Sequence, residues 1–242
     1  MRYKLHLSYN GSGYHGWQVQ ENAVSVQETL QKQLSLICRE NIEVIGCGRT
    51  DTGVHARNYV AHFDLDAELP ENFVFRINGM LPADIAIDSC EKTSDDFHAR
   101  FDATHREYKY YLHFQKDPFL EGVSWFRHRN LDFILMNEAA MLLVGKKEFT
   151  CFCKGEAPNS NYTCHVFDAN WEWNESSAVF RITADRFLRN MVRAIVGTLM
   201  EVGTGKIGVE DFKTILQNGT RSDAGSSVPA HGLFLENIEY PK

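Results

Sequence analysis

Residues 43–65 read EVIGCGRTDTGVHARNYVAHFDL and contain two predicted strands with a glycine-rich loop between them. The strands are predicted at about 43–48 and 58–65, where β-branched and aromatic residues are frequent. Small residues in the loop bracket Arg49 and Asp51, a cation and an anion two positions apart. This composition suits a backbone that turns sharply and presents a side chain at one end of a sheet.

A strand and a helix precede this stretch. Apolar residues that alternate with polar ones predict the strand, and they are Tyr3, Leu5, Leu7 and Tyr9. The helix begins at Ser25, with Glu28 as its capping-box partner. Its apolar stripe consists of Val26, Leu30, Leu34 and Ile37. Because a second helix from Pro70 and a strand from Asp84 to Glu91 follow, the first half has the order β-α-β-β-α-β.

The second half of the chain repeats this order without repeating the sequence. Strands are predicted at about 106–114, 166–173, 178–184 and 233–240, and helices at about 132–145, 186–202 and 209–217. We therefore predict an α+β fold of two ferredoxin-like or RRM-like halves, packed together with an active-site cleft between them. The N-terminal half is residues 1–102 and carries the glycine-rich loop. The C-terminal half, residues 103–242, has an insertion and an extra helix.

Composition indicates a soluble protein of the cytoplasm. Hydrophobic residues make up 43% and charged residues 24% of the chain, and no apolar run approaches the roughly 20 residues that span a bilayer. The start MRYKLHLSYN predicts a strand rather than a secretion signal. A net charge of −7 opposes indiscriminate nucleic-acid binding, so any RNA-binding face must be local.

The six cysteines are predicted to be reduced thiols, because no secretion signal is present. The nearest approach to a metal site is Cys151, Cys153, Cys164 and His165. Their spacing is C-x-C and then C-H, which is not the paired C-x-x-C of a structural zinc site. We expect no metal and no cofactor, and we interpret these cysteines as small buried side chains.

The loop admits two interpretations from its residue types alone. Asp51 could face a substrate, or it could bond to its own backbone in an ordinary hairpin, which is the commoner arrangement.

The wider pattern favours the first interpretation, because segments along nearly the whole chain resemble the tRNA pseudouridine synthase A family. The loop matches the signature G-R-T-D-x-G-V-H-A at Gly48–Ala56. Other matching N-terminal segments are Tyr9–Gln18, Ser25–Gln27, Asn78, Leu81–Ile85 and Asp96–Phe101. Matching C-terminal segments are Arg106–Tyr110, Phe187–Arg193, Ile195–Gly197 and Pro229–Leu233. All of them occur in the order that the family has.

The resemblance implies that uridine is converted to pseudouridine at the 3′ side of the tRNA anticodon arm, by a homodimer without a cofactor. It implies that Asp51 is the catalytic aspartate, that Tyr108 stacks on the base and that Arg193 is the partner of the aspartate. Arg49 and Arg189 are predicted to bind substrate. Arg49 would contact a phosphate or replace the flipped base in the stack, and His55 would form hydrogen bonds within the loop rather than transfer protons.

One carboxylate is sufficient for this isomerisation in principle, since the reaction consumes no water and changes no oxidation state. The carboxylate could add to the sugar or base as a nucleophile, or it could remove the C2′ proton, and the sequence leaves both routes open. On the predicted helix 186–202, Arg186, Arg189 and Arg193 lie at spacings of three and four and would share one face. A solvated helix face is the alternative for such arginines.

Two other functions fit parts of the pattern. A non-catalytic pair of RRM-like halves would bind RNA, but such a surface would favour aromatic residues and lysine over Asp51 and Arg193. A glycosidase or nucleosidase would need a second carboxylate as general acid, and none is near the loop in sequence. The chain also departs from the family pattern, at Asn58–Tyr59 in place of Gly-Gln and at Cys151–Cys153 in place of a Ser-Phe segment.

Overall fold

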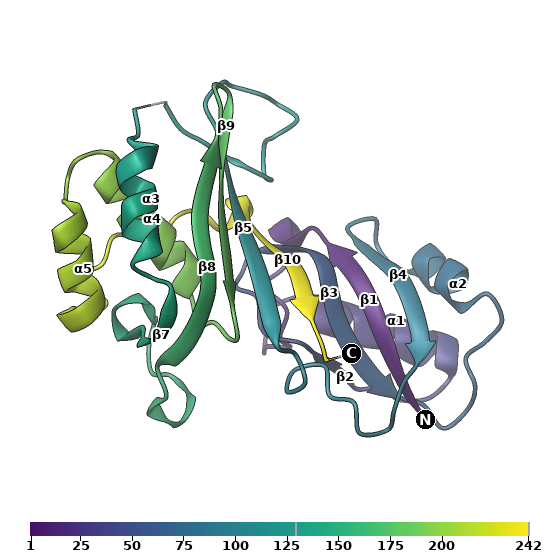
Figure 1. Ribbon diagram of the computed structural model, residues 1–242. Coiled ribbons are helices and arrows are strands. Elements are labelled where there is room, and N and C mark those ends of the chain that lie inside the picture. The colour runs from purple at the N-terminus through teal and green to yellow at the C-terminus, as the bar shows by residue number, and fades with distance from the viewer. Residues whose placement is uncertain (129, 242) are drawn as a thin grey trace. The chain divides into compact units, whose positions relative to one another are not determined.

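A computed structural model describes residues 1–128 and 130–241 of the chain (Figure 1). The fold is α+β, with mostly antiparallel strands, as predicted. The chain forms two compact units, which are residues 1–104 together with 234–242, and residues 105–233.

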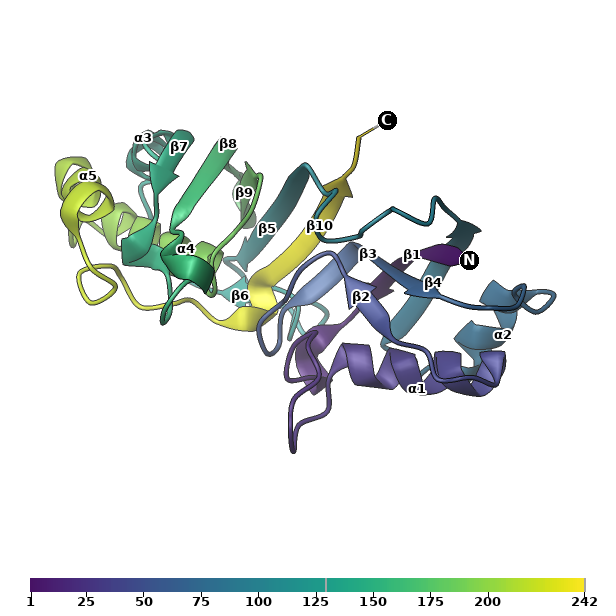
Figure 2. The same cartoon turned by 90° about the horizontal axis from the view of Figure 1, so that it is seen from below.

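The first unit is a sheet with two helices on one face (Figures 1 and 2). Its elements are β1 (Arg2–Tyr9), α1 (Val26–Cys38), β2 (Val44–Gly46), β3 (His55–Asp64), α2 (Phe73–Met80), β4 (Ile85–Lys92) and most of β10 (Leu233–Glu239). The strand order is β4-β1-β3, after which both β2 and β10 pair with β3. β1 is antiparallel to β3 and β4, and β2 is antiparallel to β3.

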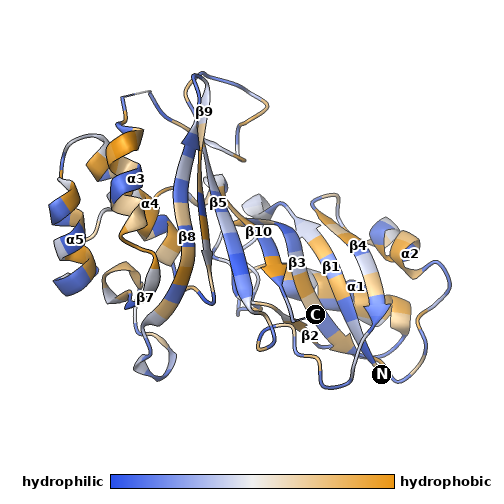
Figure 3. Ribbon diagram, viewed as in Figure 1, coloured by the Kyte–Doolittle hydropathy of each residue, from blue (hydrophilic) through white to orange (hydrophobic). Residues whose placement is uncertain are grey.

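The predicted core positions of this unit are buried. The four alternating residues of β1 are at most 5% exposed. Figure 3 shows hydrophobic bands separated by more hydrophilic ones along the strand. In α1 the buried residues are Val26, Leu30, Leu34 and Ile37, which is the predicted stripe. The helix starts where predicted, because the Ser25 hydroxyl accepts the backbone N–H of Glu28 at 3.2 Å.

The C-terminal strand belongs to the first unit by its contacts. β10 pairs in parallel with β3 through Phe234 beside His55 and Leu235 beside Ala56. The Asn58 amide also donates to the Asn237 side chain at 2.9 Å. The compact units therefore divide the chain differently from residues 1–102 and 103–242, because strand pairing between distant segments crosses that sequence boundary.

The second unit is also a sheet with its helices on one face. Its elements are β5 (His105–His113), β6 (Trp125–Phe126), α3 (Phe133–Met141), β7 (Gly145–Glu148), β8 (Thr163–Trp173), β9 (Ser177–Ala184), α4 (Met191–Gly203) and α5 (Val209–Asn218). The strand order is β5-β9-β8-β7, with β6 beside β5. Helix α4 is buried along almost its whole length, and the other two helices pack against it.

Two predicted helices of this unit have different ends in the structure. The helix predicted from Arg186 begins only at Met191, because Asn190 has a φ of +63°, which no α-helical residue adopts. Arg186 and Arg189 therefore precede α4, and their predicted place on one helix face with Arg193 is wrong. Helix α3 ends at Met141, and Gly145 starts strand β7, which the sequence did not predict.

His62 is a buried titratable group in the core of the first unit. It is 1% exposed, and its Nδ1 accepts the backbone N–H of Ala99 at 3.1 Å, while its Nε2 has no hydrogen-bond partner in the described residues. Burial, and then the nearby charges of Arg2 and His98, lower the pKa of His62 to about 4, against an opposing effect of Asp64 and Asp102. The ring is therefore neutral in the folded protein at neutral pH.

We expect acid to destabilise the fold through His62. The imidazole takes up a proton with an ordinary pKa near 6.5 when the chain unfolds, so stability is complete above that pH and is lost as pH falls toward 4. Between pH 6.5 and pH 5 the expected loss is about 2 kcal/mol, which urea unfolding at both values measures.

His62→Asn is the informative variant for this measurement, because its amide oxygen can still accept the Ala99 N–H but does not titrate. It should show a smaller loss. The exposed His165→Gln should retain the wild-type loss because it keeps His62. Equal pH dependence in the wild type and His62→Asn would show that another group is responsible.

Candidate active site

The glycine-rich loop, residues 47–54, lies between β2 and β3 and packs against the turn that follows β1. Backbone hydrogen bonds join the two segments, from Trp17 N–H to the Thr50 carbonyl at 3.3 Å and from Gly53 N–H to the Tyr14 carbonyl at 3.3 Å. Gly16 has a φ of +88°, and a Cβ placed on it would lie 2.3 Å from the Thr50 oxygen. The turn can approach the loop this closely only because position 16 has no side chain.

Buried polar and aromatic contacts hold the underside of the loop. The hydroxyl groups of Tyr9 and Thr50 form a buried hydrogen bond of 2.8 Å. The Tyr59 hydroxyl donates to the Gly48 carbonyl, and the Tyr59 ring stacks on Trp17 with 4.1 Å between centroids. Both neighbours of Arg49 are therefore anchored.

Asp51 stands in the middle of this anchored loop and is partly exposed. Its main-chain carbonyl accepts the Val54 N–H at 3.1 Å, which closes the turn. Thr50, the residue before it, is 7% exposed, so the backbone that carries the Asp51 carboxylate is held on one side by the core. The loop therefore holds the main chain of Asp51 at a partly exposed position of the unit.

His55 supports the loop and follows it directly. The ring is 1% exposed, its Nδ1 accepts the backbone N–H of Gly11 at 3.0 Å, and it stacks on Phe234 with 4.4 Å between centroids. Because Nδ1 accepts from Gly11, the ring holds the turn after β1, whereas the sequence predicted a hydrogen bond within the loop itself.

The second unit carries the other three predicted site residues. Tyr108 lies on β5, is partly exposed and meets Phe187 edge to face, with 5.1 Å between centroids. Tyr110, on the same face of the strand, is fully buried, and its hydroxyl donates to the Pro229 carbonyl at 2.9 Å. Burial raises the pKa of Tyr110 far above its ordinary value. Tyr110 is therefore a core residue, whereas Tyr108 retains an accessible part.

Arg193 and Arg189 have different environments, although they are close in sequence. Arg193 lies in the first turn of α4 and is half-buried, and its Nε donates to the Val228 carbonyl at 2.8 Å. The Val228 N–H donates in return to the Arg193 carbonyl at 3.2 Å. Arg189 is exposed in the preceding segment, where its carbonyl accepts the Lys154 N–H at 3.0 Å. Arg193 is thus positioned by the protein, and the Arg189 side chain faces solvent.

Comparison with known proteins identifies the family. The profile described as tRNA pseudouridine synthase matches residues 7–102 and 139–241, which together are most of the chain. The chain belongs to the tRNA pseudouridine synthase family. Its membership confirms the resemblance seen in the sequence.

Similar members of the family match the chain from end to end. A protein named tRNA pseudouridine synthase A from Porphyromonas gingivalis is 49% identical, over 99% of this chain and 97% of its own length. Proteins of the same name from Bacteroides fragilis and Bacillus subtilis are 48% and 38% identical, over 100% and 99% of this chain and 97% and 99% of their own lengths. The two segments that match the family profile include four of the predicted site residues, Arg49, Asp51, Arg189 and Arg193. Tyr108 lies between the two segments.

In this family member the structure shows two residues that support the predicted site residues and that the sequence did not indicate in this role. Phe187 supports Tyr108, and Val228 holds Arg193, from positions 79 and 35 residues away. No local sequence pattern could indicate these contacts, because each joins segments that only the fold brings together.

Cys151, Cys153 and Cys164 are buried in the second unit. Burial raises the pKa of Cys151 to about 11 and that of Cys164 to about 12, which disfavours the thiolate that binds metal. In residues 1–128 and 130–241, no group of three or more histidine, cysteine or acidic side chains is placed to hold a metal ion. The same residues contain no helix that is both long and apolar enough to span a membrane.

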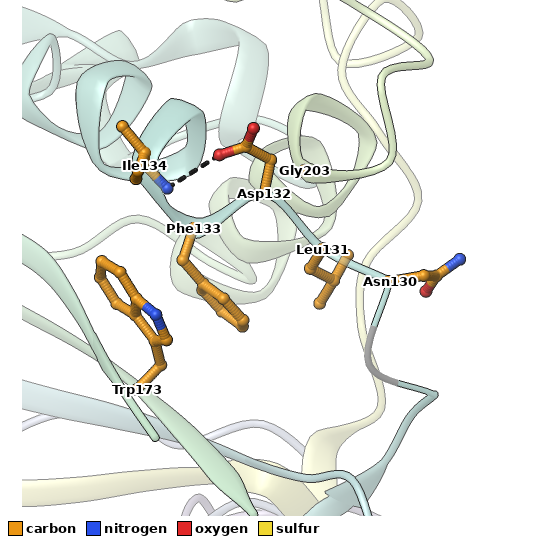
Figure 4. Close-up of a pocket in the computed structure, with 7 residues that line it drawn as sticks. All are labelled: Asn130, Leu131, Asp132, Phe133, Ile134, Trp173 and Gly203. Carbon is orange, nitrogen blue, oxygen red and sulfur yellow. Dashed lines mark hydrogen bonds between the residues drawn. The ribbon is translucent and has the colours of Figure 1, made fainter. Parts of the chain in front are cut away.

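One hollow of the second unit is lined by none of the predicted site residues. It has a volume of about 540 Å³, and Figure 4 shows it in the second unit. Its lining residues are Asn130, Leu131, Asp132, Phe133, Ile134, Trp173 and Gly203. The Asp132 carboxylate accepts the backbone N–H groups of Ile134 and Leu135 at 3.0 and 3.1 Å, so it caps helix α3.

Proposed function

We propose that this protein isomerises uridine to pseudouridine in the anticodon arm of tRNA, with the Asp51 carboxylate as its catalyst. The observation that carries the proposal is the placement of Asp51 on a loop anchored by Gly16, Tyr9 and Tyr59, in a chain that matches tRNA pseudouridine synthases from end to end. No observation favours the non-catalytic module or the hydrolase over this function.

The chemistry requires one ionised carboxylate and a uridine taken out of its stack. The N1–C1′ bond of the nucleotide breaks, the uracil turns, and C5 bonds to C1′, so that the product has the same atoms as the substrate. In one route Asp51 adds to the sugar or base and leaves again; in the other it removes the C2′ proton and later returns it. Either route brings Asp51 to the reacting atoms. We propose, from the family resemblance, that Tyr108 contacts the face of the base and that Arg193 pairs with the charge of the aspartate.

The proposed architecture places these residues on two ferredoxin-like halves, residues 1–102 and 103–242, with the active-site cleft between them. In support, the first unit contains the antiparallel order β4-β1-β3-β2 with two helices on one face. That order is expected for a β-α-β-β-α-β half of this class. A cytoplasmic location, where tRNA is available, is part of the same proposal.

A direct assay tests the function and separates it from its alternatives. Purified protein is incubated with an unmodified tRNA transcript, and nucleosides are analysed after digestion. We expect pseudouridine in the anticodon arm and no free uracil. A binding module would yield neither product, and a hydrolase would release uracil.

We expect the two arginines of the second unit to affect different steps. Arg189 is exposed and is proposed to contact phosphate, so Arg189→Ala should reduce the slope of log affinity against log salt by about one. Arg193 is held by Val228 and is proposed to pair with Asp51, so Arg193→Ala should lower the single-turnover rate with the salt slope unchanged. A salt titration of tRNA binding and single-turnover rates for both variants make this comparison. A reduced slope with normal chemistry in Arg193→Ala would assign Arg193 to RNA binding instead.

The working unit is proposed to be a homodimer, and the outer face of α3 supports this. The buried face of the helix is apolar, and its exposed residues also include three apolar ones, Ile134, Leu135 and Met141, which are 65%, 38% and 70% exposed. Glu138 is the charged residue among them. Ile134 also lines the hollow in Figure 4, beside the stacked rings of Phe133 and Trp173. Such a surface suits a second copy of the chain.

We expect the double variant Ile134→Glu, Met141→Glu to be a monomer in light scattering at concentrations where the wild type is a dimer. Leu36→Glu is the matched control, because it places the same charge on an exposed apolar position of α1, which is 59% exposed. A monomeric active wild type would overturn the dimer. A dimeric double variant would move the contact to another face.

A further inference from the structure

A chain of side-chain hydrogen bonds connects helix α1 to Arg49, two residues before Asp51. The Arg49 Nε donates to the Oε1 atom of Gln18 at 3.2 Å. The Nε2 group of Gln18 donates to the Oε1 atom of Gln27 at 2.9 Å. Gln27 lies in the first turn of α1, so the chain links the guanidinium to a regular element of the first unit.

Main-chain groups determine the orientation of both amides in this chain. The Val19 N–H donates to Gln27 Oε1 at 3.0 Å, and Gln27 Nε2 donates to the Val44 carbonyl at 2.8 Å. An N–H can only donate and a carbonyl can only accept, so Gln27 cannot be turned around. With its oxygen directed at Gln18, Gln18 must direct its NH₂ group at Gln27 and its own oxygen at Arg49. The Val19 N–H and the Val44 carbonyl therefore determine, through Gln27 and then Gln18, that the Arg49 Nε–H faces the amide oxygen of Gln18.

This arrangement leaves the end of the Arg49 side chain available. The residue is exposed, and in residues 1–128 and 130–241 the Nε–H is the part of its guanidinium that forms a hydrogen bond. A guanidinium is planar, so a bond at Nε restricts the direction of its two NH₂ groups. Two parallel N–H groups match two oxygens of a phosphate. The Tyr59 bond to the Gly48 carbonyl and the Tyr9 bond to Thr50 hold the backbone on either side of the same arginine.

We propose that Gln18, oriented by Gln27, is a positioning residue that presents the Arg49 guanidinium to a backbone phosphate of the tRNA beside Asp51. This inference rests on the proposed function for the identity of the ligand. The contacts that orient Arg49 belong to the free protein and can be tested without activity. Gln18 itself touches no substrate and acts through Arg49.

A double-mutant cycle tests the proposal on the full chain, with Gln18→Leu, Arg49→Ala and the combined variant. Arg49→Ala should reduce the salt slope of tRNA binding by about one, because one phosphate contact is lost. Gln18→Leu should keep the slope, since the charge remains, but should weaken tRNA binding and slow single turnover by about 3- to 10-fold, because the side chain must be ordered on binding. In the Arg49→Ala background, Gln18→Leu should cost less than about 2-fold.

A matched control and a spectroscopic measurement complete the test. Gln20→Leu changes the same residue type in the same segment and should leave the rate unchanged, because the Gln20 side chain donates to the main-chain carbonyls of His15 and Gln18. The Arg49 Nε–H resonance, identified by its loss in Arg49→Lys, should exchange with water faster in Gln18→Leu than in the wild type.

The possible outcomes are distinct. Equal costs of Gln18→Leu in both backgrounds, or an unchanged exchange rate, would overturn the positioning role. If Arg49→Ala changed neither tRNA binding nor the single-turnover rate, the positioning role would also be overturned, because Gln18 would then have no functional side chain to position. If the wild type forms no pseudouridine, the proposed function fails, and the exchange measurement still decides whether Gln18 orients Arg49.

Discussion

Asp51→Asn is expected to abolish pseudouridine formation, with a loss of about 10⁴-fold or more in single-turnover rate. The amide has nearly the shape of the carboxylate, but it carries no charge, is a poor nucleophile and does not accept a proton at neutral pH. The Asp51 main-chain carbonyl accepts the Val54 N–H, and the substitution leaves this bond in place. The affinity for tRNA should therefore stay within a few-fold of the wild type.

Single-turnover rates and tRNA binding, measured on the same preparations, check this expectation. Asp66→Asn is the matched control, because it removes one exposed carboxylate from the same unit outside the loop, and it should react at the wild-type rate. A rate near that of the wild type in Asp51→Asn would remove Asp51 from the chemistry. Loss of both affinity and rate would instead assign the aspartate to binding or to the shape of the loop.

Gly16→Ala should have the second largest effect, because it separates the loop from the turn that anchors it. An added Cβ would lie 2.3 Å from the Thr50 oxygen and 3.1 Å from the Asp51 carbonyl carbon, in a residue whose φ of +88° already disfavours alanine. Backbone strain and overlap together should cost about 3 kcal/mol or more of unfolding free energy. Activity should fall with the displacement of Asp51, even in the fraction that remains folded.

Gly48→Ala provides the control within the loop, since a Cβ there would meet no atom within 4 Å. The unfolding free energy of Gly48→Ala should be within about 1 kcal/mol of the wild-type value, and the variant should retain activity. Urea unfolding and single-turnover rates of both variants show whether any added side chain in this region is destabilising or whether the effect comes from the close approach at Gly16. Equal effects of the two substitutions would show that the contact with Thr50 is unimportant.

Local patterns in the sequence predicted the regular elements well where one physical signal was strong. The β1 alternation and the α1 stripe are confirmed because each element buries one face, and burial imposes a period on the residues themselves. The start of α4 was predicted too early, since the apolar residues Phe187 and Leu188 extend the helical pattern through a segment that Asn190 interrupts with a positive φ. Asparagine adopts that conformation readily, but nothing in its neighbours signals where it will do so.

The sequence alone indicated the family and the candidate catalytic residue, because the loop that places Arg49 and Asp51 beside small residues is a short continuous motif. The sequence did not indicate which residues contact this loop in the folded protein. Gln18 reaches Arg49 across 31 positions, and Phe234 reaches His55 across an even longer separation. Such contacts depend on strand pairing and on the approach of the turn at Gly16. They arise only when the backbone has folded, since hydrogen bonds and ring contacts are set by distances in space and leave no period along the sequence.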